Sequence, residues 1–185
     1  SREADAVIYT QAGMEISVAS TKAYITQLLV IYLLAIRIAQ IKGQISESKA
    51  SELLAELKAI PEKAKQLLDS KESVQRFAAR RFRDKSTFFI GRGMDYALAM
   101  EASLKLKEVS YVHSEAYAAG ELKHGTIALI EDNTLVVALA TQHTLLEKTV
   151  SNIQEVKARG AFVLGVLQNK DAASADQMDD CFIIP

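Results

Sequence analysis

The sequence predicts an α/β fold: a doubly wound parallel sheet with helices on both faces. Several short runs, such as Thr134–Ala140 (TLVVALA), are almost continuously apolar, which is typical of strands that are buried on both sides. Longer amphipathic segments alternate with these runs. Gly43 and Gly160 stand where helical patterns end. We therefore expect right-handed crossovers between parallel strands.

The N-terminal quarter predicts one strand and one long helix. Ala6–Tyr9 (AVIY) has the composition of a strand, and Thr21–Lys42 that of a helix that ends at Gly43. Ser20 or Thr21 is expected to cap this helix, a role worth about 1 kcal/mol. Its central run Leu28–Ile36 is too short to cross a bilayer, which needs about 20 apolar residues. The helix is therefore expected to be buried on most sides, and any face left exposed should be adhesive.

The remainder alternates helices and strands, with the best domain boundary at residues 43–46. Pro61 is suited to the first turn of a helix. The expected helices are Ser46–Ile60, Pro61–Leu68, Ser70–Asp84, Tyr96–Tyr111 and Thr144–Arg159, the expected strands are Thr87–Ile90, Thr134–Ala140, Ala161–Leu167 and Cys181–Ile184, and Ala116–Leu122 is expected to be a short helix or turn.

Composition favours a cytoplasmic globular protein. Apolar residues make up 49% of the 185, and 22 basic residues nearly balance 23 acidic ones. We therefore expect no general attraction to nucleic acid or to membranes. The basic run Arg76–Lys85 is better explained as the end of an amphipathic helix than as a nucleic-acid patch. The single cysteine, Cys181, suits a reducing compartment and is expected to be an inert core residue.

The most informative stretch is Gly91–Thr126, which brings acids, a lysine and a histidine close together. Glu101, Lys105 and Glu108 share one face of a predicted helix. Spacing alone favours a solvated salt-bridge ladder, worth a few tenths of a kcal/mol. Apolar and small residues occupy most other positions of this helix, however, so some of the charge is expected to be enclosed. An enclosed carboxylate beside a fixed cation can abstract a proton.

Two glycine-bounded turns flank this helix. Gly91-Arg92-Gly93 follows the apolar run Phe88–Ile90, at the strand end where doubly wound sheets bind ligands. The glycines permit close approach to an anion, but an ordinary strand-to-helix turn explains them better. The second turn, Lys123-His124-Gly125, presents an imidazole, which can exchange protons near neutral pH. His113 and His143 lack metal-ligand spacing with any cysteine or acid cluster.

Two long motifs carry a family resemblance. Gly91-Arg92-Gly93 with Glu101–Gly125 (EASLKLKEVSYVHSEAYAAGELKHG), and upstream Ala12–Tyr24 (AGMEISVASTKAY), resemble the isomerase half of the glutamine–fructose-6-phosphate aminotransferases. Members of that family are built from sugar isomerase (SIS) domains, which are flavodoxin-like three-layer sandwiches. The resemblance implies that residues 1–43 are the C-terminal remnant of a first SIS domain, a strand and a helix. Residues 44–185 would then be a second SIS domain, truncated at its C-terminus.

The resemblance also implies a reaction and site residues. Fructose 6-phosphate and ammonia, which a glutamine amidotransferase domain releases, would give glucosamine 6-phosphate for hexosamine biosynthesis. Glu108 matches the general base, and Glu101 and Lys105 match partners that assist proton handling. His124 matches a histidine linked to ring opening in the pocket of a neighbouring subunit, so a homodimer is implied. Val18 and Ser20 match residues that line the sugar-phosphate pocket.

The resemblance implies no metal or organic cofactor. The family's Schiff-base lysine would follow Pro185 and its phosphate loop would precede Ser1, so this chain alone is expected to be inactive. Two other classes remain open. One is a non-catalytic SIS regulator that binds sugar phosphates, which is expected to lack the Glu108–His124 pair. The other is a dimerisation module, which predicts no ligand pocket in the intact protein, contrary to the charged helix face.

Overall fold

The computed structural model describes residues 3–185. These residues form two compact units, one that ends at Ser70 and one from Lys71 to Pro185. We describe each unit by itself.

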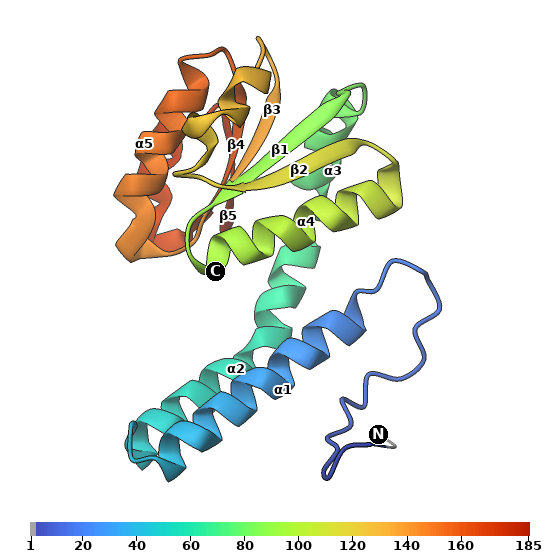
Figure 1. The fold of residues 1–185 in the computed structure, drawn as a ribbon, viewed down its shortest axis with the longest axis vertical. Helices are drawn as coiled ribbons and strands as arrows, with labels where there is room; N and C mark the ends of the chain where they lie inside the picture. Colours follow the sequence, from blue (N-terminus) through green and yellow to red (C-terminus); the bar gives the residue numbers. More distant parts are fainter. Residues whose placement is uncertain (1–2) are drawn as a thin grey trace. The chain divides into compact units, whose positions relative to one another are not determined.

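The first unit contains two helices that pack against each other, α1 (Lys22–Ile41) and α2 (Glu47–Asp69) (Figure 1). Gly43 has a φ of +64° in the turn between them, which glycine adopts without strain. Ser46 caps α2, because its side chain accepts a hydrogen bond of 3.1 Å from the Lys49 amide.

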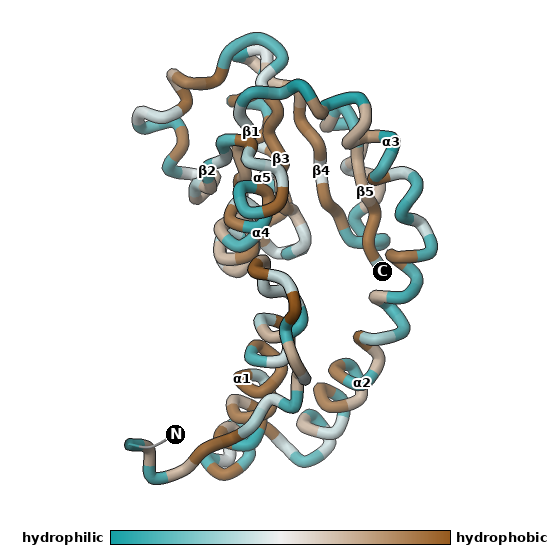
Figure 2. Tube along the Cα trace, turned by 90° about the vertical axis from the view of Figure 1, so that its right-hand side faces the viewer, coloured by the Kyte–Doolittle hydropathy of each residue, from teal (hydrophilic) through white to brown (hydrophobic). Residues whose placement is uncertain are grey.

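Helix α1 is not buried on most sides, contrary to the sequence prediction. None of its residues is buried, although its sequence is strongly apolar (Figure 2). The reason is that α2 is the one helix that packs on it within its unit. By length and composition alone α1 could also cross a membrane, but the core helix of a soluble protein passes the same test.

Of two predictions for the N-terminal segment, the strand is wrong and the helix cap is right in position only. Ala6–Tyr9 is irregular rather than a strand, since no neighbouring strand in its unit offers the hydrogen bonds that a strand requires. Thr21 stands at the N-cap of α1 without a side-chain hydrogen bond. A carboxylate oxygen of Glu15 instead accepts a 3.1 Å hydrogen bond from the Ala23 amide.

Helix α2 runs through Pro61, where the sequence predicted two helices. A proline inside a helix removes one backbone hydrogen bond and crowds the preceding turn. The surrounding residues are mostly strong helix formers, and α2 also packs on α1, which together offset that loss. Because α2 packs on α1, the compact units divide at Ser70 and Lys71, whereas the sequence placed the boundary at residues 43 and 44. The assignment of residues 1–43 to a first SIS domain stays a prediction.

The second unit is a five-stranded parallel sheet in the order β2-β1-β3-β4-β5, the doubly wound arrangement that the sequence predicts. Its strands are β1 (Ser86–Gly91), β2 (His113–Ala118), β3 (Leu135–Ala140), β4 (Phe162–Gln168) and β5 (Asp180–Ile184). Its helices are α3 (Lys71–Arg81), α4 (Met94–Ser110) and α5 (Leu146–Lys157), with short 3₁₀ turns η1 (Leu122–His124), η2 (Thr126–Leu129), η3 (His143–Leu145) and η4 (Asn169–Gln177).

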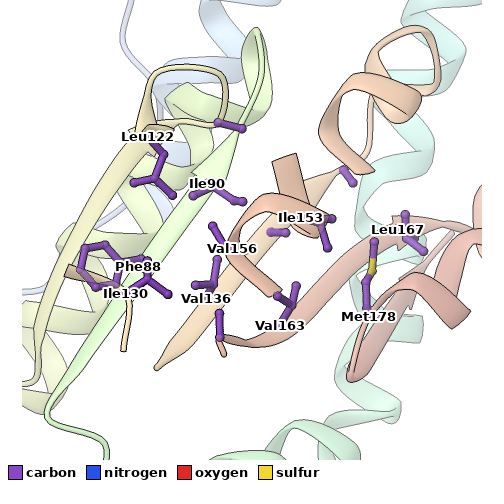
Figure 3. Close-up of a cluster of buried hydrophobic side chains, with 14 residues drawn as sticks. Phe88, Ile90, Leu122, Ile130, Val136, Ile153, Val156, Val163, Leu167 and Met178 are labelled. Atoms are coloured by element: carbon purple, nitrogen blue, oxygen red, sulfur yellow. The ribbon is translucent and has the colours of Figure 1, made fainter. Parts of the chain in front are cut away.

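Side chains that alternate along the strands form two layers of core. On one face, β1, β3 and β4 pack against α5 and the 3₁₀ turns (Figure 3). On the other face, Phe77 of α3 packs on Leu135 and Leu164, and α4 lies along β1 and β2 (Figure 1). Between α3 and α4 an apolar groove of about 600 Å³ leaves part of that face uncovered.

Strand β2 is the clearest error of the sequence prediction, which gave a short helix or turn at Ala116–Leu122. Its residues, HSEAYA, are polar or small rather than apolar. The segment is nevertheless a strand because it pairs along its whole length with β1, from Ser86 opposite His113 to Gly91 opposite Ala118. As an edge strand it pairs on one side only, and this edge needs no continuous apolar run.

Candidate active site

In the turn before α4, the backbone at Gly91 lies very close to the backbone at Asp95. Gly91 ends β1, and a Cβ there would lie 2.5 Å from the Asp95 carbonyl carbon, so glycine is required. Gly93 has a φ of +55°, which also favours glycine. The Arg92 carbonyl accepts a 2.6 Å hydrogen bond from the side-chain Nε2 of Gln142, and the Arg92 side-chain Nε donates to Asn152 Oδ1 at 3.0 Å. Arg92 therefore joins this turn to the end of β3 and to α5.

Asp95 fixes the first turn of α4. It is buried, and its carboxylate accepts hydrogen bonds from the Thr141 amide at 2.8 Å, the Thr141 hydroxyl at 2.6 Å and the Gln142 amide at 3.3 Å. A carboxylate at a helix N-terminus is also favoured by the helix dipole. The start of α4 is thus tied to the end of β3.

A pair of buried hydroxyls fixes the middle of α4. The Ser103 and Ser114 oxygens lie 3.0 Å apart, and the Ser114 hydroxyl donates to the Ser103 carbonyl at 2.8 Å. Ser103 belongs to α4 and Ser114 to β2, so this contact sets which face of the helix turns toward the sheet. The remaining faces carry the charged residues.

The predicted ladder of charges is present on α4. Lys105 Nζ lies 2.6 Å from Glu108 Oε2 and 3.6 Å from Glu101 Oε1. All three side chains are partly enclosed, with 23–30% of their surface exposed. The hydrogen bond to Glu108, together with the charges of both carboxylates, raises the pKa of Lys105 above its ordinary value. Lys105 therefore stays protonated at neutral pH and holds both carboxylates beside a fixed cation.

His124 is held apart from this ladder. It ends η1, where the buried Leu122 anchors the turn, and its side chain is exposed. Within residues 3–185, no hydrogen bond or ion pair joins His124 to the α4 ladder. Val18 and Ser20 belong to the other compact unit, where Val18 is fully exposed. Within the second unit, the structure thus brings together Glu101, Lys105 and Glu108 and does not join His124 to them.

A second pair of polar side chains lies on the edge strand. The Tyr117 hydroxyl donates a hydrogen bond to Glu115, and this bond, with partial burial, raises the pKa of Tyr117. Glu115 Oε1 also lies 3.5 Å from His113 Nε2. Among the described residues, no group of three or more His, Cys, Asp or Glu side chains is arranged to hold a metal ion.

Sequence reasoning missed Asp95, Ser103 and Ser114. An acidic residue in the first turn after a Gly-x-Gly turn is a recognisable signal of a helix start, and Asp95 fits it. No signal was available for the serine pair, because it joins two elements whose pairing depends on the tertiary fold.

The family model for the SIS domain matches residues 82–185, which cover β1 to β5 and all the turns between them. The chain belongs to the SIS domain family. The family match agrees with the five-stranded parallel sheet and with the resemblance found in the two sequence motifs.

Relatives of this SIS-domain chain include several enzymes named glutamine–fructose-6-phosphate aminotransferase [isomerizing]. The protein from Caldanaerobacter subterraneus subsp. tengcongensis is 56% identical over 185 residues, and that from Methanosarcina acetivorans is 47% identical over 184. Each match covers 100% of this chain but only 30% of the relative. The chain thus spans less than a third of the length of these relatives.

Solved structures show the same SIS architecture. The C-terminal domain of glucosamine-fructose-6-phosphate aminotransferase from Francisella tularensis superimposes with a TM-score of 0.94 at 37% identity, over 99% of this chain and 52% of that one. Glucosamine-6-phosphate deaminase from Thermotoga maritima superimposes with a TM-score of 0.59 at 29% identity, over 79% of this chain and 42% of that one.

Proposed function

We propose that this chain is the isomerase part of a glutamine-dependent fructose-6-phosphate aminotransferase. The proposal is supported by the identity to relatives with that name and by the partly exposed Glu101–Lys105–Glu108 cluster of charges. In the whole enzyme, ammonia from glutamine condenses with the C2 carbonyl of fructose 6-phosphate and water leaves. The C1 proton then moves to C2 and the proton of the C1 hydroxyl moves to the nitrogen, which gives the C1 aldehyde and C2 amine of glucosamine 6-phosphate.

The observation that carries the proposal is the 2.6 Å contact between Lys105 Nζ and Glu108 Oε2 on a helix tied to the sheet. In our proposal Glu108 removes the C1 proton and returns it at C2. Lys105 stays charged and stabilises the negative charge that develops on the sugar oxygen. Glu101 forms a second ion pair with Lys105 and helps to position it. None of these steps requires a metal or an organic cofactor.

The remaining site residues act across elements and subunits in this proposal. His124 assists ring opening in the pocket of a neighbouring subunit, which fits its exposed place on η1 and, among the described residues, its lack of a hydrogen bond or ion pair to the α4 ladder. Val18 and Ser20 line the sugar-phosphate pocket. The protein would then be a cytoplasmic homodimer in hexosamine biosynthesis, with a glutamine amidotransferase domain elsewhere in the full-length protein.

The test is Glu108→Gln in a full-length enzyme that contains these 185 residues. The amide keeps the shape of the side chain and loses the base, so turnover should fall by about 10²–10⁴ while substrate affinity changes little. The direct measurement is exchange of the substrate's C1 hydrogen with solvent deuterium.

Glu131→Gln is the matched control, because Glu131 is an exposed carboxylate in a turn outside the α4 cluster. It should leave both exchange and turnover unchanged. If Glu108→Gln exchanges as fast as the unaltered enzyme, the cluster is a salt-bridge ladder and the non-catalytic alternatives gain support.

A further inference from the structure

A histidine–aspartate pair outside the α4 cluster lies at the carboxyl ends of β3 and β4. His143 begins η3, shortly after β3, and Asp171 lies in η4, shortly after β4. The two strand ends are neighbours, since Ala140 pairs with Leu167. His143 Nδ1 and Asp171 Oδ1 are 2.6 Å apart, a short and direct hydrogen bond.

The two partners differ sharply in exposure. The Asp171 side chain is 2% exposed and its second oxygen, Oδ2, is buried without a hydrogen-bond partner among residues 3–185. The His143 side chain is 65% exposed. An ionised carboxylate can only accept a hydrogen bond, so in the neutral form of the ring the proton lies on Nδ1 and Nε2 has a free lone pair.

The other two histidines lack this arrangement. His113 meets Glu115 through Nε2 at 3.5 Å, and Glu115 is 38% exposed. His124 is exposed on η1 and has no partner of this kind among the described residues. A buried carboxylate with an unpaired oxygen is costly for a folded protein. The hydrogen bond between His143 and Asp171 involves only Oδ1, so it does not offset the cost of burying Oδ2 without a partner.

We propose that His143 is a nucleophilic histidine that accepts a phosphoryl group from a small activated donor of the acyl phosphate or phosphoramidate class. The Nε2 lone pair forms the new N–P bond, the bond from phosphorus to the donor's leaving group breaks, and the leaving group departs with that electron pair. Asp171 keeps the Nδ1 proton hydrogen-bonded and stabilises the positive charge that develops on the ring. No oxidant or reductant takes part.

The position of His143 favours a phosphoryl group over other electrophilic groups as the group that the histidine accepts. η3 runs directly into α5, a helix of 12 residues, so a phosphoryl group on His143 would lie close to the positive end of that helix. This inference does not depend on the proposed aminotransferase function, because it uses none of the α4 residues.

The experiment treats the 185-residue chain with potassium phosphoramidate and follows each histidine by peptide mass spectrometry. His143 should be phosphorylated about tenfold or more faster than His113 or His124, because a charge-assisted hydrogen bond that strengthens in the transition state lowers the barrier. ³¹P NMR should place the phosphoryl group on Nε2. Equal rates at the three histidines, or a product on Nδ1, would overturn the proposal.

Asp171→Asn tests the role of the carboxylate, and Asp176→Asn, an exposed aspartate of the same turn, is its matched control. Asp171→Asn should slow His143 to the rate of His113, and Asp176→Asn should not. Unchanged phosphorylation of His143 in Asp171→Asn would contradict the proposal. If circular dichroism shows that Asp171→Asn does not fold, the comparison of the three histidines within the unaltered chain decides the question.

Discussion

At the scale of single residues, Cys181 should be a slow nucleophile in the folded chain. It lies on β5 and packs against the core beneath α5, and burial and the nearby Asp180 raise the pKa of its thiol. A raised thiol pKa leaves less thiolate at any given pH, and the thiolate is the reactive form. Iodoacetamide at mildly alkaline pH should therefore alkylate the native chain severalfold more slowly than the chain unfolded in urea.

Because Cys181 is the only cysteine, total label incorporated reports this one site. A model peptide with the sequence around Cys181 is the control for the chemical reactivity of the thiol. Equal rates for the native and unfolded chains would mean that the thiol is accessible and unperturbed, contrary to its partial burial against the core.

Also at this scale, the sequence identified site residues where the contact is local. Glu101, Lys105 and Glu108 follow from helical spacing alone, and the structure confirms that they meet. Asp95 and Thr141 are 46 residues apart, and His143 and Asp171 are 28 apart, so neither contact could be predicted without knowledge of the strand order. The roles given to His124, Val18 and Ser20 stay predictions.

At the scale of elements, apolar content predicted the positions of β1, β3, β4 and β5 and did not predict the edge strand β2. β3 and β4 are recognisable because both faces of each strand are covered. β2 is covered less and pairs only with β1, so a strand could be assigned there only from its partner. The irregular Ala6–Tyr9 is the converse case, an apolar run that forms no strand without a partner.

Helix α2 should become more stable when Pro61 is replaced by alanine. Pro61 lies inside the helix and cannot donate a backbone hydrogen bond, and alanine can. Pro61→Ala should stabilise α2 by about 1–3 kcal/mol, less whatever entropy the unfolded chain regains. Amide hydrogen exchange along α2 measures the effect, and protection should rise on both sides of position 61.

Lys58→Ala is the control, because Lys58 is an exposed residue of the same helix. Lysine and alanine both have a high helix propensity. It should change protection little. Faster exchange in Pro61→Ala would show that α2 needs the distortion at Pro61 to pack on α1, and that the proline stabilises this unit.

At the scale of the whole molecule, the alternation of strands and helices was enough to predict a doubly wound sheet but not its strand order. The class follows from apolar strands and amphipathic helices in turn. The order β2-β1-β3-β4-β5 depends on pairings between distant segments, such as β1 with β3. The division of the compact units at Ser70 and Lys71 likewise depends on a tertiary contact, that of α2 with α1.

The 185-residue chain should self-associate through its first unit. α1 is apolar and has no buried residue, and Ile31 and Ile38 are 59% and 50% exposed on one face of it. Apolar surface of this extent rarely stays in contact with water. Sedimentation over about a hundredfold range of concentration should therefore show a mass above that of the monomer that falls on dilution.

The double variant Ile31→Lys, Ile38→Lys should restore the monomer, because two charges on that face would have to be desolvated in any contact. Val109→Lys is the matched control: Val109 is also a β-branched residue exposed on a helix, but it lies on α4 in the second unit. It should leave the association intact. If Val109→Lys dissociates the chain and the double variant does not, the contact surface belongs to the second unit. A monomer at every concentration would mean that the exposed face of α1 is covered within the same chain.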